Sequence, residues 1–248
     1  MTDFRQNLDQ WLNILNKLKF DIQPIAFKFL TTKPDGIDKL DKKVGLCEMM
    51  KIAQEGKAFY ADEENHECLP GLFAIGGADK PYLYKSGLFG AEGEWYDESR
   101  ACRRLYERAP MLAKDTVKYV AFSPLDKLSF EPDLLILVAN IEQTTVLLRA
   151  MCYGTGKDII SHFTPVLACV WIFNQPYLTG EINYITTGIG AGMRRRKVVP
   201  PGLQLFSIPY DMFSTMLESL QKMPWVHPLN SPDGEEWMQR LKTKLDIK

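Results

Sequence analysis

Hydrophobic positions recur along the chain with two spacings, one typical of helices and the other typical of strands. From Phe4 to Leu18 they follow helical spacing, which predicts an amphipathic helix over residues 3–19. Residues 134–141 and 166–173 are short, nearly continuous apolar runs, as expected of a buried strand or a core helix segment. The same patterns predict strands at 22–32, 57–62, 117–124, 133–140, 181–187 and 203–209, and helices at 44–55, 97–109, 141–153, from 211 and from 231.

Helical and strand patterns follow one another along the whole chain, which predicts an α/β fold, with a mixed α+β fold as the alternative. No Ser/Gly-rich linker and no low-complexity segment divides it, so we expect one domain over residues 1–248. A weak internal similarity places glycine loops at the same distance after Cys68 and Cys169, which favours two diverged halves near residues 22–110 and 118–210. Chance is the alternative, because glycine commonly follows a strand.

Composition and charge narrow the classes of function. The 248 residues carry a net charge of −1, so no overall field favours nucleic acid or an anionic membrane, and we expect neither as a partner. The N-terminal residues lack a signal-peptide pattern and no apolar run is long enough to cross a bilayer, which predicts a cytoplasmic protein. The cysteines number five, and this odd count argues against a disulfide framework.

Three of the cysteines are candidate ligands. Cys47 falls in the first turn of a predicted helix, where backbone amides and nearby lysines favour a thiolate. Cys68 lies in a predicted loop two residues after His66, and Cys169 lies in an apolar run. No C-x-x-C spacing is present, so a metal or iron–sulfur site would require these three thiols to converge through folding. Ordinary core thiols are the alternative, and the two other cysteines, Cys102 and Cys152, are interpreted as structural or surface residues.

The segment TTGIGAGMRRRKVVPPG, residues 186–202, combines alternate glycines with a run of positive charge. A dinucleotide fingerprint would need a long helix after the glycines, but the two prolines at residues 200 and 201 leave too little room. Alternate glycines also allow backbone amides to converge on an anion, beside arginines that bind phosphate or carboxylate. A solvated basic turn is the alternative. The residues of this candidate anion site are Gly188, Gly190, Gly192, Arg194 and Arg195.

The cysteines and the second glycine loop together resemble a known family. Cys47, Cys68 before Gly71, and the stretch LACVWIFNQPYLTGEINYITTGIGAGMR resemble an uncharacterised bacterial and archaeal family labelled ArCR, over roughly Pro24 to Pro209. The family carries no assigned reaction, but its recurring cysteines strengthen the case for the three candidate thiols. Gly190 stands where several members are expected to have a cysteine, so this chain departs from the family at one potential ligand.

Two hypotheses of different class remain. In the first, Cys47, Cys68 and Cys169 bind an iron–sulfur cluster or another metal. In the second, the glycine–arginine segment binds a phosphate- or carboxylate-bearing small molecule without redox chemistry. Whether the protein is an enzyme, and whether it forms a homo-oligomer, is left open by the sequence.

Overall fold

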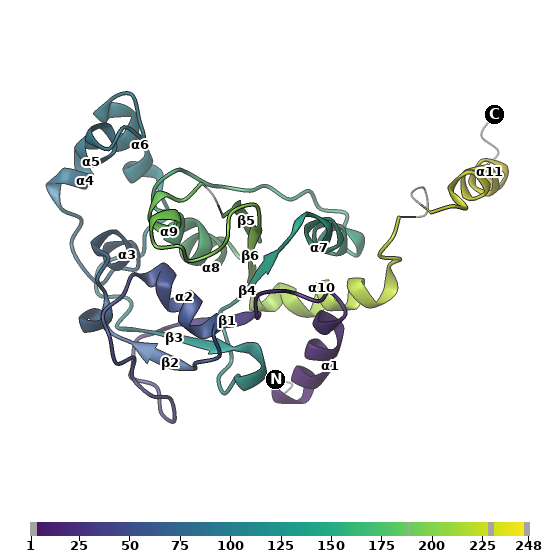
Figure 1. Ribbon diagram of the computed structural model, residues 1–248, viewed down its shortest axis with the longest axis horizontal. Coiled ribbons are helices and arrows are strands. Elements are labelled where there is room, and N and C mark those ends of the chain that lie inside the picture. Colours follow the sequence, from purple (N-terminus) through teal and green to yellow (C-terminus); the bar gives the residue numbers. More distant parts are fainter. Residues whose placement is uncertain (1–3, 188, 228–230, 246–248) are drawn as a thin grey trace.

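The computed structural model describes residues 4–187, 189–227 and 231–245, and within them an antiparallel sheet lies between two layers of helices (Figure 1). The six strands have the order β2-β3-β1-β4-β6-β5. Their bounds are Ile25–Leu30 for β1, Phe59–Ala61 for β2, Tyr119–Pro124 for β3, Leu134–Ala139 for β4, Asn183–Thr186 for β5 and Gln204–Pro209 for β6.

Successive side chains of each strand point to opposite faces of the sheet, so each face has its own hydrophobic core. In β1, Phe27 packs into one core and Ala26 into the other. In β4 every residue is buried, because helices cover both faces at the centre of the sheet. We call the side with Phe27 the α2 face and the side with Ala26 the α10 face, after a helix that packs on each.

Three helices of equal length cover the α10 face: α1 (Phe4–Asn16), α7 (Ile141–Tyr153) and α10 (Tyr210–Lys222). Helix α7 begins at a capping box, in which the Asn140 side chain accepts from the Gln143 amide at 2.9 Å and the Gln143 side chain accepts from the Asn140 amide at 2.8 Å. Trp11 of α1 meets Phe213 of α10 edge to face, with ring centroids 5.2 Å apart.

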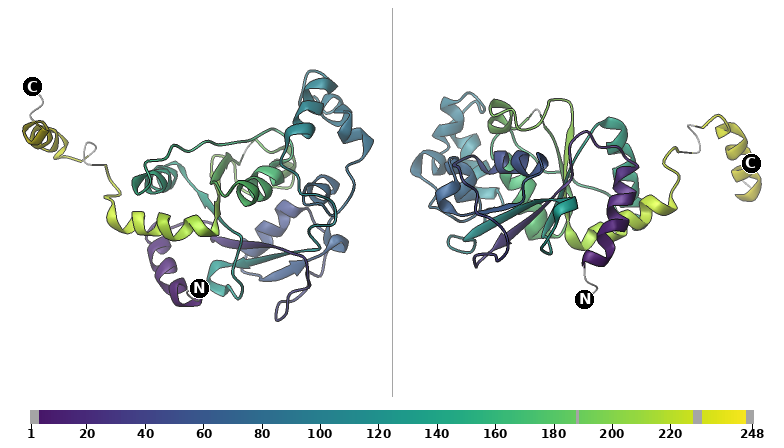
Figure 2. Two further views of the ribbon diagram at one scale, coloured as in Figure 1. Left: turned by 180° about the vertical axis from the view of Figure 1, so that it is seen from behind. Right: turned by 60° about the horizontal axis from the view of Figure 1, so that its bottom comes forward.

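Shorter elements cover the α2 face, and several of them are only one or two turns long (Figure 2). Helices α4, α5 and α6 extend from this side of the molecule, away from the sheet. The elements on this side of the molecule are α2 (Leu46–Gln54), the 3₁₀ turn η1 (Glu63–Asn65), α3 (Leu69–Ala74), α4 (Tyr82–Lys85), α5 (Leu88–Glu92), α6 (Ser99–Arg108), the π-helix η3 (Val170–Asn174), α8 (Gln175–Thr179) and α9 (Ala191–Arg195). A second 3₁₀ turn, η2 (Leu125–Lys127), follows β3.

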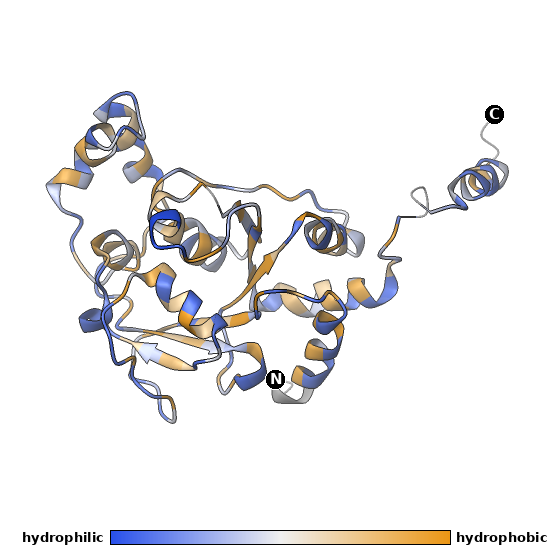
Figure 3. Ribbon diagram, viewed as in Figure 1, coloured by the Kyte–Doolittle hydropathy of each residue, from blue (hydrophilic) through white to orange (hydrophobic). Residues whose placement is uncertain are grey.

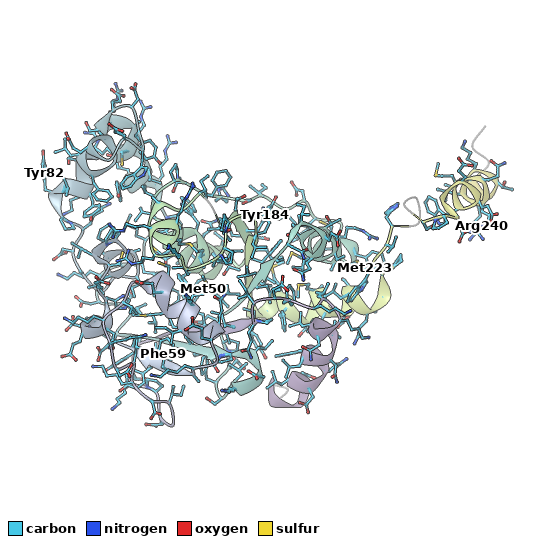
Figure 4. All side chains as sticks on the ribbon, in the orientation of Figure 1. Met50, Phe59, Tyr82, Tyr184, Met223 and Arg240 are labelled. Carbon is cyan, nitrogen blue, oxygen red and sulfur yellow. The ribbon has the colours of Figure 1, made fainter. Side chains whose placement is uncertain are left out.

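Hydropathy follows this layered arrangement. The strands and the inner sides of the helices are hydrophobic, and α9 is strongly hydrophilic (Figure 3). Met50 and Phe59 lie inside the molecule, whereas Tyr82 lies on its outer edge (Figure 4). Helix α11 (Gly234–Leu245), which carries Arg240, stands apart from the rest of the chain. Among the described residues, no helix combines the length and the apolar composition needed to span a bilayer.

The prediction of a mixed α/β chain is confirmed, and the antiparallel sheet gives it the α+β form. Residues 166–173 were expected to form a buried strand or a core helix segment, and the structure has a helical segment there, since η3 begins at Val170. The proposed halves contribute unequally: β1 and β2 fall within residues 22–110, and the other four strands within 118–210. Cys68 follows β2 and Cys169 precedes β5, and the duplication stays a prediction.

Candidate functional site

Folding brings Cys47, Cys68 and Cys169 to the wall of one cavity of about 390 Å³ on the α2 face, which we call the thiol cavity. Cys47 is the second residue of α2, Cys68 directly precedes α3, and Cys169 directly precedes η3. The three thiols therefore come from three segments that are far apart in the sequence. Each sits at the start of a helical element, which fixes its position on the rigid part of the fold.

Close packing of backbone segments brings these helix starts together. A side chain at Gly71 would place its Cβ 3.2 Å from the Cβ of Leu46, so the first turns of α2 and α3 lie in tight contact. On the other side of the cavity, a Cβ at Gly190 would lie 2.9 Å from the Cβ of Ala168. Leu167 has a φ of +60°, a left-handed conformation that a branched side chain rarely adopts. Such backbone strain is typical of functional sites, and here it lies two residues before Cys169.

The thiols influence one another electrostatically. Burial raises the pKa of Cys47 to about 12, with a further contribution from Cys68, while Arg196 acts in the opposite direction. Burial also raises the pKa of Cys169, again with contributions from Cys68 and Cys47. Without a cation among them, these two thiols are therefore neutral at physiological pH. A bound cation would reverse this, because it stabilises the thiolate form.

Arg196 is the arginine that the fold fixes beside the thiols. Its Nε donates to Glu48 Oε2 at 2.6 Å, and its Nη2 lies 3.8 Å from Glu67 Oε2. The same Glu48 oxygen accepts from the Gly45 amide at 2.7 Å, and this contact caps α2 two residues before Cys47. Only 14% of the Arg196 side chain is exposed. Its charge therefore lies at the cavity wall but is already paired with two carboxylates.

The residues of the candidate anion site are divided by the fold. Gly192 and Arg195 line the thiol cavity, whereas Arg194 lines a different cavity together with Lys197. Gly190 precedes α9 with a φ of −76° and packs against Ala168. Gly188 lies outside the described residues. Gly190 therefore allows close packing, whereas a side chain at Gly192 would meet no other atom within 4 Å.

The remaining cysteines lie elsewhere. Cys102 of α6 is fully buried, and a Cβ at Gly90 would approach its sulfur to 2.2 Å, so it fills the contact between α5 and α6. Cys152 lies on α7, on the opposite side of the sheet from the thiol cavity. His66, which lies two residues before Cys68 in the sequence, lines a separate cavity with Asp62 and Glu63.

Aromatic residues, which the sequence did not single out, form the outer wall of the thiol cavity: Tyr84, Phe89, Trp95 and Tyr106. They come from α4, α5, α6 and the loop between α5 and α6. The segment that carries them, residues 75–111, leaves and re-enters the body at one point. There the Asn174 amide donates to the carbonyls of Ala74 at 2.6 Å and Pro110 at 3.0 Å, and the Leu112 amide donates to Ala74 at 3.0 Å.

A metal site of the simplest kind is not formed. Within residues 4–187, 189–227 and 231–245, no three His, Cys, Asp or Glu side chains are arranged to hold a metal ion. The three thiols line one cavity without forming such a group. Two signals in the sequence relate to this site: the cysteines themselves and the arginine run, of which only the third member is fixed beside the thiols.

Comparison with known proteins places the chain among uncharacterised relatives. The family DUF169, described as uncharacterised ArCR, matches residues 13–219. The chain is 23% identical over 234 residues to an uncharacterised protein, MJ0308, of the archaeon Methanocaldococcus jannaschii, a match that spans 89% of this chain and 95% of the relative. No solved structure matches this chain. Since the family match extends over most of the chain, this protein belongs to the DUF169 family of uncharacterised ArCR proteins.

Proposed function

We propose that this protein binds an iron–sulfur cluster through Cys47, Cys68 and Cys169. The observation that supports the proposal is the common cavity of these three thiols, which come from separate segments. Thiolates are the usual protein ligands of such clusters. A cluster contains several iron atoms and so needs its thiolates around a volume, in keeping with the way these thiols are spread over the wall of a cavity of about 390 Å³.

The electrostatics of the cavity also support a cationic occupant. Two of the thiols have a raised pKa, with burial as the main cause, so they lose their protons readily only when iron takes the place of the proton. Arg196 lies close enough to oppose the rise at Cys47. Three protein ligands leave one iron of a four-iron cluster without a protein ligand, and that iron would be open to a small molecule in the cavity.

The test is anaerobic reconstitution of the purified chain with ferrous iron and sulfide. We expect bound iron and sulfide in stoichiometric amounts and the broad visible absorption of a cluster. Replacement of Cys47, Cys68 or Cys169 by Ser should remove most of the iron, whereas Cys152→Ser is the matched control and should retain it. Circular dichroism of each variant establishes that it is folded. Equal iron binding by the wild type and a variant with all three cavity thiols replaced would overturn the proposal.

A second candidate function is binding of a phosphate- or carboxylate-bearing small molecule without a cluster. It is favoured by one observation: Arg195 and Gly192 line the same cavity, and no ion pair involves Arg195 in the part of the chain that the structure describes. Colourless, iron-free protein whose melting temperature rises with phosphate or acetate would favour this alternative. Loss of that rise in Arg195→Gln would assign the binding to this cavity.

A further inference from the structure

The outer wall of the thiol cavity is a continuous aromatic surface. Tyr84 and Phe89 have ring centroids 4.7 Å apart, and Phe89 and Trp95 have centroids 5.1 Å apart. Tyr106 meets Tyr84 edge to face at 5.7 Å. A wall of rings in mutual contact keeps its shape and presents flat apolar surface, which favours a planar ligand.

One residue of this wall, Tyr106, carries a buried polar atom without a partner among the described residues. The residue is only 2% exposed, and its hydroxyl is buried without a hydrogen-bond partner in the described part of the chain. A buried hydroxyl in this state reduces stability, so its position calls for an explanation. Burial raises the pKa of Tyr106, with contributions from Cys102 and Cys169 among others, so the hydroxyl keeps its proton and is able to donate it in a hydrogen bond.

Two further residues of the cavity lining supply positive charge. Arg195, the last residue of α9, and Arg196, which follows it, line the cavity, and Arg196 is already paired with Glu48. That leaves Arg195 as the cation available to a ligand. The volume of about 390 Å³ is near the lower end for small-molecule pockets, and a cluster on the thiols would take up part of it. The remaining room suits one ring and not a nucleotide.

From these three features we infer that the thiol cavity has a second compartment, which binds a small aromatic carboxylate between the aromatic wall and Arg195. The ring packs on Tyr84, Phe89 and Trp95, and the Tyr106 hydroxyl donates a hydrogen bond to the ligand. Because the compartment and the three thiols share one cavity, the ligand would lie next to the proposed cluster. The meaning of that position rests on the proposed function, but binding of the carboxylate does not require iron.

The test is calorimetric titration with benzoate, carried out on iron-free and on reconstituted protein. Cyclohexanecarboxylate has the same charge without a flat ring, and acetate has no ring. We expect benzoate to bind at least about tenfold more tightly than either, because only a flat ring stacks on the wall. Equal affinity for the three acids would overturn the assignment of the aromatic wall.

Two variants test the polar contacts. Tyr106→Phe should weaken benzoate binding by about tenfold, the usual effect of one lost hydrogen bond to a charged group, and Arg195→Gln should weaken it at least as much. Tyr106→Phe should also raise the melting temperature of the free protein by about 2–4 °C, because it removes a buried unsatisfied hydroxyl. Tyr153→Phe, on the exposed surface of α7, is the matched control and should change neither value.

The results separate this inference from the cluster proposal. Benzoate binding by iron-free protein that never takes up iron would support the compartment and overturn the cluster. Iron uptake without any benzoate binding would overturn the compartment alone. A stability loss in Tyr106→Phe without a change in benzoate affinity would show that the hydroxyl is structural.

Discussion

The two faces of the sheet are covered in different ways. On the α10 face, α1, α7 and α10 are each 13 residues long, and their apolar sides meet in a core that includes Trp11 and Phe213. On the α2 face the cover is made of shorter elements, including η3 and α9 with five residues each. The long helices of the α10 face pack their continuous apolar sides on the sheet, whereas the short elements of the α2 face bring several helix starts together around the thiol cavity. The difference shows how this fold separates stability from a candidate site.

The largest expected effect comes from a deletion in the core of the α10 face. Phe213 is completely buried, so Phe213→Ala should lower the free energy of unfolding by about 3–5 kcal/mol. Phe89 is only partly buried and already borders the thiol cavity, so Phe89→Ala should cost less than half of that. Urea unfolding of the two variants measures both values. Equal losses would show that the α2 face is as tightly filled as the α10 face.

The second effect concerns His66, whose pKa is lowered to about 4, chiefly by burial, with Asp62 acting in the opposite direction. Between about pH 6.5 and pH 4 the unfolded chain binds a proton that the folded chain does not, so the free energy of unfolding falls as the pH falls through this window. The full loss is about 3 kcal/mol, reached below pH 4. We expect His66→Gln to lose less stability than the wild type between pH 7 and pH 4, as measured by urea midpoints. An unchanged pH dependence would contradict the prediction.

The smallest expected effect on stability distinguishes Arg194, which lies in α9, from Arg196, which directly follows it. Arg196→Gln removes the contact with Glu48 at a site where only 14% of the arginine side chain is exposed, and should cost about 1–2 kcal/mol. Arg194 is exposed, and Arg194→Gln should change stability by no more than about 0.5 kcal/mol. Thermal unfolding compares the two. A larger effect for Arg194 would reverse the assignment of the fixed arginine.

The same contrast explains which elements could be predicted from the sequence. The helix at Ile141–Tyr153 agrees with its prediction at both ends, because Asn140 and Gly154 mark it with a cap and a stop. The strand at Leu134–Ala139 lies within its predicted range, since burial on both faces produces a continuous apolar run. Local signals suffice wherever an element follows one regular period.

The site is harder to predict, because it depends on contacts between distant segments. The cysteines were candidates by residue type and by resemblance, but nothing local indicates that Cys47, Cys68 and Cys169 share a cavity. The arginine run indicated positive charge but not which arginine would be held in place. The contact from Arg196 to Glu48 spans 148 positions of the chain, and no local sequence pattern predicts it. The aromatic wall lacked any signal, because its members lie on three short helices and a loop whose packing is purely tertiary.

The hydrogen bond from the Leu112 amide to the Ala74 carbonyl, which also accepts from the Asn174 side chain, places the two ends of residues 75–111 side by side. Cys47, Cys68 and Cys169 all lie outside this segment. Replacement of this segment by a different helical hairpin would therefore alter what the cavity accepts while the sulfur atoms keep their positions. Within such an architecture, the aromatic wall of the cavity and its three thiols are free to diverge independently.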